Sequence, residues 1–171
     1  MHYATRRARW HAPLLVALLL PLGWPAAQPA TMDLEGAFTL DHAASEDAGP
    51  LDFALEPAAQ ARLRWLTRPA ERLVIATTRT ETTVVFDRTA VRAPSDGREV
   101  PWTGPRGAQW HVTTEWTNGT LTQTLRGDDL TRTWAMTESD NGRTLTVDVR
   151  VTGEAGAQPI RLRYRLVYRR A

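Results

Sequence analysis

The sequence predicts an all-β domain, an antiparallel meander of about eight or nine strands folded as an up-and-down barrel or a curled sheet, with a short N-terminal helical segment. From Glu71 onward, apolar residues alternate with Thr, Arg, Asp and Glu, which is typical of strands with one buried and one solvated face. Turn dipeptides interrupt this alternation at short intervals, and short connections make successive strands neighbours. A closed barrel would also remove the exposed edges of such a sheet.

Residues 1–30 have the order of charged, apolar and small residues that marks a secretory signal peptide. Three arginines precede an apolar run over residues 13–24 and alanines follow it, which predicts cleavage near residues 27–30. The alternative is a membrane anchor, but the run is too short to span a bilayer stably. We therefore expect residues 31–171 to form a single β domain without a transmembrane segment, exported to the periplasm or secreted.

Removal of the signal peptide would change the charge of the chain. The full sequence has 21 Lys and Arg against 19 Asp and Glu; residues 1–30 hold three of the arginines and no acid, which leaves 18 against 19. A domain with this balance is not expected to bind nucleic acid. The sequence contains no Cys, which excludes disulfides, thiolate catalysis and zinc–cysteine sites. Residues 31–60 carry seven acids and no arginine, so they either neutralise a basic face of the sheet or stay solvated.

The N-terminal part of the domain predicts one strand and a short helical region. A strand is expected over residues 34–41, and Ser45, followed by two acids, resembles a helix N-cap. Prolines limit the helical pieces to residues 51–55 and 58–66, and the second piece ends at residues 67–69, which include another proline.

Three turn dipeptides set the register of the strands that follow. Asn118-Gly119 and Asn141-Gly142 favour two-residue hairpin loops, and Gly127-Asp128 suits a type II′ turn. When partners are counted outward from these turns, apolar residues meet apolar residues in all three hairpins, and a slip of one residue would destroy that match. The count predicts two inner rows and two exposed ion pairs: Trp116–Leu121–Trp134–Val149, Thr114–Gln123–Arg132–Val151, Arg126 with Asp129, and Asp140 with Arg143.

The first and last strands resemble those of lipocalins. Gly36-Ala37-Phe38 resembles the Gly-x-Trp start of that family, and the last strand contains several arginines. The resemblance implies that an arginine of the last strand packs over the aromatic residue, which here is Phe38 rather than Trp. The disulfide common in lipocalins is absent.

The chain resembles more closely a group of uncharacterised exported bacterial proteins with a lipocalin-like, calycin-type barrel. This likeness covers nearly the whole mature chain in short, mostly structural motifs. It implies the fold and the compartment but brings no mechanism. The segments that carry it are residues 34–41 with Ser45, 71–75, 96–99, 115–116, 132–134, 142–145 and 167–169.

The sequence offers no pattern typical of an enzyme, a cofactor site or a metal site. Ser45, Ser95 and Ser139 fall at predicted caps or turns, and no nucleophile elbow surrounds them. His111 and Glu115 lie on the solvated face of one strand, where a metal pair is less common than simple solvation. No pair of inward carboxylates and no phosphate-binding glycine loop is present. We therefore expect a protein that is not an enzyme and needs no cofactor or metal.

The candidate site consists of polar residues on the apolar face. Thr114, Gln123 and Arg132 could anchor the carboxylate or phosphate of a ligand at the bottom of an apolar cavity, since an unpaired buried guanidinium is costly. The alternative is structural: Arg132 reaches the barrel mouth or pairs with Gln123 and an internal carboxylate. The aromatic residues are expected to line the same pocket or to form the core: Trp102, Trp110, Trp116, Trp134, Tyr164 and Tyr168.

Two functions remain open at this stage. The first is an exported, non-enzymatic domain that binds a small apolar or amphipathic ligand in a barrel interior, which requires space inside. The second is a structural or protein-interaction module with a filled core, for which the protein partner is unknown. Arg161, Arg163 and Arg165 form a stripe on the outer face of the last strand, where they either bind an anionic partner or protect an exposed strand.

Overall fold

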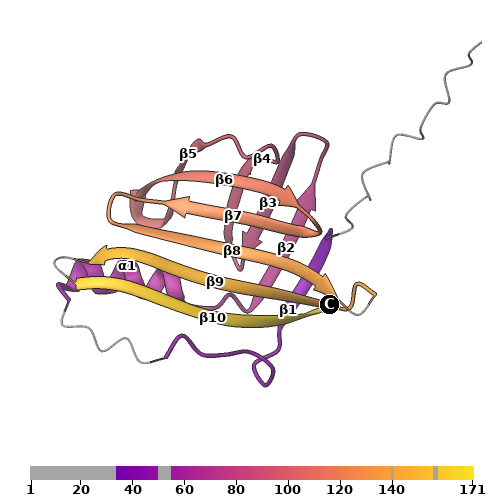
Figure 1. Ribbon diagram of the computed structural model, residues 1–171, viewed down its shortest axis with the longest axis horizontal. Helices are drawn as coiled ribbons and strands as arrows, with labels where there is room; N and C mark the ends of the chain where they lie inside the picture. Colours follow the sequence, from indigo (N-terminus) through magenta and orange to yellow (C-terminus); the bar gives the residue numbers. More distant parts are fainter. Residues whose placement is uncertain (1–33, 50–54, 140, 156–157) are drawn as a thin grey trace, which may run out of the picture. The chain divides into compact units, whose positions relative to one another are not determined.

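Ten antiparallel strands form one sheet in the computed structural model, which describes residues 34–49, 55–139, 141–155 and 158–171 of the unit Met32–Ala171 (Figure 1). Strands that follow one another in the sequence are neighbours throughout, except β4 and β5, and β1 pairs with β10. The predicted all-β antiparallel meander is confirmed, with ten strands. The elements are β1 (Gly36–Leu40), α1 (Pro57–Thr67), β2 (Arg72–Thr77), β3 (Glu81–Phe86), β4 (Thr89–Pro94), β5 (Val100–Thr103), η1 (Pro105–Gly107), β6 (Gln109–Thr117), β7 (Thr120–Arg126), β8 (Leu130–Ser139), β9 (Thr144–Ala155) and β10 (Gln158–Arg170).

The barrel is nearly closed, and its open seam lies between β4 and β5. No ladder of hydrogen bonds joins these two strands. The indole Nε1 of Trp102 on β5 donates to the carbonyl of Ala90 on β4 at 3.1 Å. The backbone N–H of Gly97, in the connection between these strands, donates to the carbonyl of Thr114 on β6 at 2.9 Å. We refer to this line as the β4–β5 seam.

Two of the three predicted hairpin registers are confirmed. At the β6–β7 turn, Trp116 faces Leu121 and Thr114 faces Gln123. At the β8–β9 turn, Met136 faces Val147 and Trp134 faces Val149, as the count outward from Asn141-Gly142 predicted. Positive φ angles at both residues of each Asn-Gly pair explain why these dipeptides fix a tight loop.

The predicted register of the β7–β8 hairpin is wrong by two residues. The loop is longer than two residues, since the N–H of Gly127 donates to the carbonyl of Leu130 at 2.9 Å. Gly153 on β9 supports this longer loop, because a Cβ at that position would collide with the carbonyl of Asp129. A shift of two keeps every side chain on its face but changes its partners. The observed inner rows are Trp116–Leu121–Met136–Val147, Thr114–Gln123–Trp134–Val149 and Val112–Leu125–Arg132–Val151.

The shifted register also removes the predicted ion pair between Arg126 and Asp129. Arg126 instead lies 2.6 Å from Glu99, and Asp129 lies 3.5 Å from Arg62 on α1. The other predicted pair involves Asp140, which lies outside the described residues.

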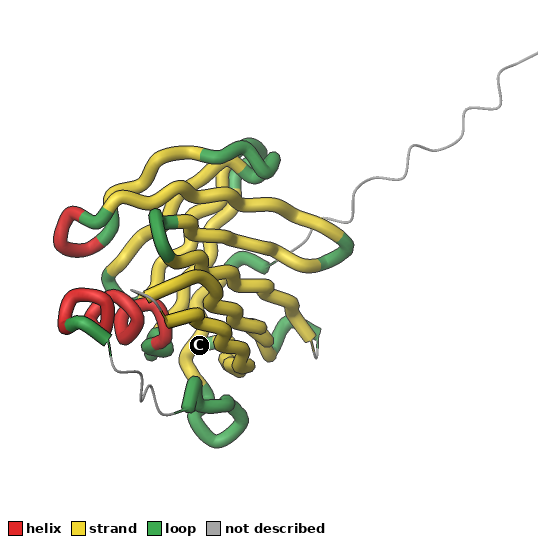
Figure 2. The backbone as a smooth tube through the Cα atoms, turned by 60° about the vertical axis from the view of Figure 1, so that its left-hand side comes forward, coloured by secondary structure: helices red, strands yellow, loops and turns green. Residues whose placement is uncertain are grey.

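The helix α1 lies at one end of the barrel (Figure 2), and it confirms the helical piece predicted over residues 58–66. Its side chains Leu63 and Leu66 are fully buried. The other predicted piece, residues 51–55, falls almost entirely outside the described residues. None of the helices within the described ranges has the length and apolar character needed to traverse a lipid bilayer.

Ser45 does not cap a helix, contrary to the prediction. Its hydroxyl donates to the carbonyl of Asp41 at 2.8 Å and accepts the N–H of Val167 at 2.9 Å. The N–H of Glu46 donates to the carbonyl of Arg165 at 2.7 Å. The chain after β1 therefore continues along β10, and backbone bonds to that strand take the place of a helix.

Candidate functional site

Arg132 on β8 points into the barrel, and only 5% of the residue is exposed. Its guanidinium carbon lies 3.9 Å from the centre of the Trp134 ring. Within the described ranges it forms no ion pair, and its Nε has no hydrogen-bond partner. Burial lowers the pKa of Arg132 to about 10, while the nearby Tyr164 and Tyr168 act in the opposite direction. The side chain therefore stays charged at neutral pH without an acid beside it.

Gln123 and Thr114 lie on the same inner face, in the row beside that of Arg132, and both are fully buried. The amide Nε2 of Gln123 donates to the hydroxyl of Thr114 at 3.1 Å, while Gln123 Oε1 has no partner. Gln123 faces Trp134 directly across the β7–β8 ladder, and the indole Nε1 of Trp134 also has no partner. We call Gln123, Arg132 and Trp134 the polar cluster. Buried polar atoms almost always have a partner, so three unpartnered atoms in adjacent residues need an explanation.

Aromatic side chains surround the polar cluster. The Trp134 ring stacks on Phe86 of β3 at 4.4 Å, so the two rings bridge opposite parts of the barrel. The Tyr164 hydroxyl donates to the carbonyl of Thr67 at 2.9 Å, and burial raises the pKa of this phenol. Trp116 is only half-buried, and its Nε1 donates to the hydroxyl of Thr82 at 3.4 Å. The predicted site residues therefore share the inner face, and Trp116 lies nearer its margin.

The interior around the polar cluster is filled by side chains. Gln123 and Val149 are 0% exposed and Trp134 is 1% exposed. A void large enough for a water molecule would expose the atoms that border it, so these side chains pack as densely as a protein core. A ligand can reach Arg132 only if some of them move.

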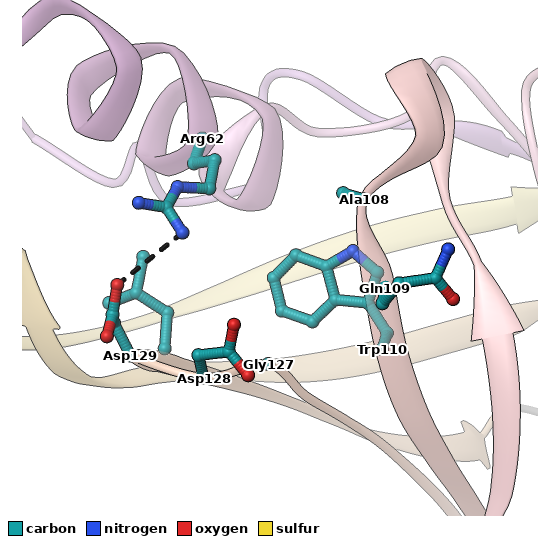
Figure 3. Close-up of a pocket in the computed structure, with 8 residues that line it drawn as sticks. Arg62, Ala108, Gln109, Trp110, Gly127, Asp128 and Asp129 are labelled. Carbon is teal, nitrogen blue, oxygen red and sulfur yellow. Dashed lines mark ion pairs between the residues drawn. The ribbon is translucent and has the colours of Figure 1, made fainter.

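Tryptophans join α1 to the barrel rim. Trp65 on α1 lies 6.3 Å from Trp102 and 5.7 Å from Trp110, measured between ring centres. Trp110 also lines a surface hollow of about 160 Å³. Figure 3 shows the residues that line it, with Arg62 and Asp129 forming an ion pair. These contacts hold the helix over the end of the barrel. Neither Trp65 nor the stacking of Phe86 was predicted, because contacts across a barrel leave no local sequence pattern.

The three predicted arginines of the outer face do not behave alike. Arg165 pairs with Asp148 at 3.1 Å. Arg161 and Arg163 are exposed and form no side-chain bond with any described residue, and Arg163 faces Arg150 directly across the β9–β10 ladder. The positive charge of this face therefore lies on Arg150, Arg161 and Arg163. Arg150 and Arg163 repel each other, because like charges directly opposite in a ladder are unfavourable.

The acidic segment after β1 contacts β10 through Asp41 and Glu46. Asp41 lies 2.7 Å from Arg169, and the hydrogen bond from that guanidinium holds the pKa of the Asp41 carboxyl below its usual value. The Oε2 of Glu46 accepts the backbone N–H of Arg165 at 2.8 Å. Neutralisation of a basic side chain by the acidic segment is thus supported for Asp41, whereas Glu46 bonds to the backbone of β10.

His111 lies on the outer face, where its Nδ1 is 3.2 Å from Glu99. The hydrogen bond from Arg126 lowers the pKa of Glu99. Within residues 34–49, 55–139, 141–155 and 158–171, no group of three or more His, Cys, Asp or Glu side chains is placed to hold a metal ion.

The packing feature implied by the lipocalin resemblance is present with a different aromatic residue. The guanidinium carbon of Arg170, on β10, lies 5.0 Å from the centre of the Phe38 ring on β1. The same side chain donates to the carbonyls of Gly142 and Glu35, at 2.6 and 2.8 Å. Arg170 therefore fastens the first and last strands together, and a phenyl ring serves in place of an indole.

No protein-family model matches the sequence, and no curated protein is similar to it in sequence. Solved structures do share its fold. Lipid binding protein 8 of Caenorhabditis elegans, in its apo form, is 12% identical with a TM-score of 0.55, covering 83% of this chain and 98% of that one. Fatty-acid-binding protein 1 of Echinococcus granulosus is 10% identical with a TM-score of 0.52, covering 80% and 96%. The fluorescent protein UnaG is 16% identical with a TM-score of 0.52, covering 80% and 96%.

At these identities the likeness shows the fold alone. Lipocalin barrels have eight strands, whereas this sheet has ten. The ten-stranded barrel of this chain shares its fold with the fatty-acid-binding and lipid-binding structures named above.

Proposed function

We propose that the protein binds a small amphipathic anion, with the charged head of the ligand at Arg132 and its apolar part among the surrounding aromatic side chains. The observation that carries this proposal is a buried guanidinium without an acid among the described residues. An uncompensated buried charge is costly, and a carboxylate or phosphate would compensate it through charge-assisted hydrogen bonds.

The structural neighbours support the choice of the barrel interior as the binding site. Two of them are a fatty-acid-binding protein and a lipid binding protein. Apolar interiors with a few fixed polar groups are the usual form of small-molecule sites. Arg132, Gln123 and Thr114 are such polar groups in this barrel, and Trp134 and Tyr164 supply apolar surface beside them.

Binding requires the filled interior to open. The β4–β5 seam is the place where the sheet can part, since no ladder of hydrogen bonds joins these two strands. Separation of Phe86 from Trp134 would then free the space next to Arg132. The free energy of this opening is subtracted from the intrinsic affinity, so we expect moderate rather than very tight binding.

Export and the absence of catalysis belong to the same proposal. Export to the periplasm or out of the cell is supported by the order of charged, apolar and small residues in residues 1–30. Binding without chemistry is supported by the side chains around Arg132, which in the described part of the chain include no carboxylate or thiol.

The test compares an acid with its neutral analogue. Purified protein is titrated with tetradecanoate and with tetradecanol, and native mass spectrometry checks the stoichiometry. We expect tighter binding of the acid, and Arg132→Met should weaken tetradecanoate binding about tenfold or more while tetradecanol is unaffected. Arg163→Met is the matched control, because it removes an exposed positive charge. Equal affinities for acid and alcohol, or no effect of Arg132→Met, would contradict the proposal.

A second function, an interaction module with a filled core, is favoured by the near-zero exposure of the interior. In that case neither amphiphile binds, and the exposed arginines Arg161 and Arg163 are the contact surface. Native mass spectrometry of the same samples would then show either an unliganded monomer or a defined oligomer, and Arg163→Met would weaken any oligomer.

A further inference from the structure

We infer that the ligand carries a hydrogen-bond donor beside its anionic group, so that its class is a hydroxylated amphipathic acid rather than a simple fatty acid. This inference rests on the proposed function, because it concerns the head group that would lie at the polar cluster. It follows from the chemical nature of the buried atoms in the cluster that lack hydrogen-bond partners.

The unpartnered atoms are of two opposite kinds. Arg132 Nε and Trp134 Nε1 are donors and need acceptors, whereas Gln123 Oε1 is an acceptor and needs a donor. An ionised carboxylate offers only acceptors. It would satisfy the two donors and leave the oxygen of Gln123 without a partner.

The amide of Gln123 is bonded to Thr114 through its nitrogen. The Nε2 atom donates to the Thr114 hydroxyl at 3.1 Å, and neither residue is exposed. The amide oxygen is therefore turned away from Thr114, and water in the bulk cannot reach it.

The three atoms belong to one small region. Gln123 is the direct ladder partner of Trp134, and the Arg132 guanidinium lies 3.9 Å from the ring of the same Trp134. Adjacent strands are about 4.8 Å apart. A hydroxyl on carbon 2 or 3 lies beside the carboxylate, so a head group of this kind brings a donor and acceptors together into the region that these three residues share.

The experiment compares acids that differ by one hydroxyl. Affinities for tetradecanoate, 2-hydroxytetradecanoate and 3-hydroxytetradecanoate are measured by calorimetry with the wild-type protein, Gln123→Met and Gln109→Met. We expect one hydroxy acid to bind the wild-type protein about tenfold or more tightly than tetradecanoate, because the plain acid leaves a buried oxygen unpaired. The ratio should fall to about one in Gln123→Met. Gln109→Met, the same change at an exposed position, should keep the ratio.

The outcomes separate this inference from the proposed function. If the plain acid binds as well as or better than both hydroxy acids, the inference is wrong, although binding of the acid still supports an anion site at Arg132. If none of the acids binds, the proposed function fails and the inference fails with it. If Gln123→Met does not fold, the wild-type ratio alone decides, and Thr114→Val, which releases the amide of Gln123, should lower that ratio.

Discussion

Replacing Arg132 by Met removes a buried positive charge and keeps most of the volume of the side chain. Burial lowers the pKa of Arg132 to about 10, and a displacement of this size from the ordinary arginine value corresponds to about 3 kcal/mol against the charged form. Met loses the contact of the guanidinium with the Trp134 ring, worth about 1 to 2 kcal/mol at a buried position. The ligand-free variant should therefore be more stable than wild type by about 1 to 2 kcal/mol.

Urea unfolding of the ligand-free proteins, followed by far-ultraviolet circular dichroism, measures this difference without relying on the fluorescence of Trp134. Arg163→Met is the control, since a change at an exposed position should stay within about 0.5 kcal/mol. A variant destabilised by more than about 1 kcal/mol would refute the reasoning. It would mean that Arg132 is compensated within the fold and has a structural role rather than awaiting an anion.

Three further predictions concern the frame of the site. Gly153→Ala should destabilise the fold by about 3 kcal/mol or more in urea unfolding, because the added carbon would collide with the backbone of the β7–β8 loop. Trp65→Ala should raise the hydrogen-exchange rates of the α1 amides, because it removes the ring contacts with Trp102 and Trp110. Arg62→Ala breaks an exposed ion pair on the same helix and should cost less than about 1 kcal/mol of stability. Burial raises the pKa of the Tyr168 phenol, so the unfolded chain loses this proton first and the contribution of Tyr168 to stability falls as the pH rises above about 10. The lowered pKa of Arg132 acts in the opposite direction, because there the folded chain loses its proton first. Tyr168→Phe should therefore raise the urea midpoint at pH 11 relative to pH 8 when compared with wild type.

The hairpin registers show how far local sequence determines this fold. Asn118-Gly119 and Asn141-Gly142 fix tight loops through their own backbone preferences, and both registers were predicted correctly. Gly127-Asp128 did not predict the loop that follows β7, because its length depends on Gly153, a residue on another strand. The alternation still placed every side chain on the correct face, since an error of two residues preserves the face.

The candidate site was predictable in its members but not in its contacts. Arg132, Gln123 and Thr114 were expected on the inner face, and all three are buried there. That Gln123 faces Trp134 rather than Arg132 follows from the shifted register. The stacking of Phe86 on Trp134 depends on the curvature of the whole sheet, which brings β3 near β8 and which no pattern within a single strand specifies.

The pairing of β1 with β10 has a consequence for how the chain acquires its structure. The hydrogen bond from the N–H of Ala171 to the carbonyl of Ala37 joins residues more than a hundred positions apart, and contacts of such long range form slowly because a large loop must close first. The hairpins of β6 to β9 can form as soon as their own residues have been synthesised. The pairing that completes the sheet must wait until β10 has left the ribosome, so β1, which pairs with β2 on one side, lacks its other neighbour until then. This interval exposes apolar strand surface, and it is when we expect aggregation or chaperone binding to compete most strongly with folding.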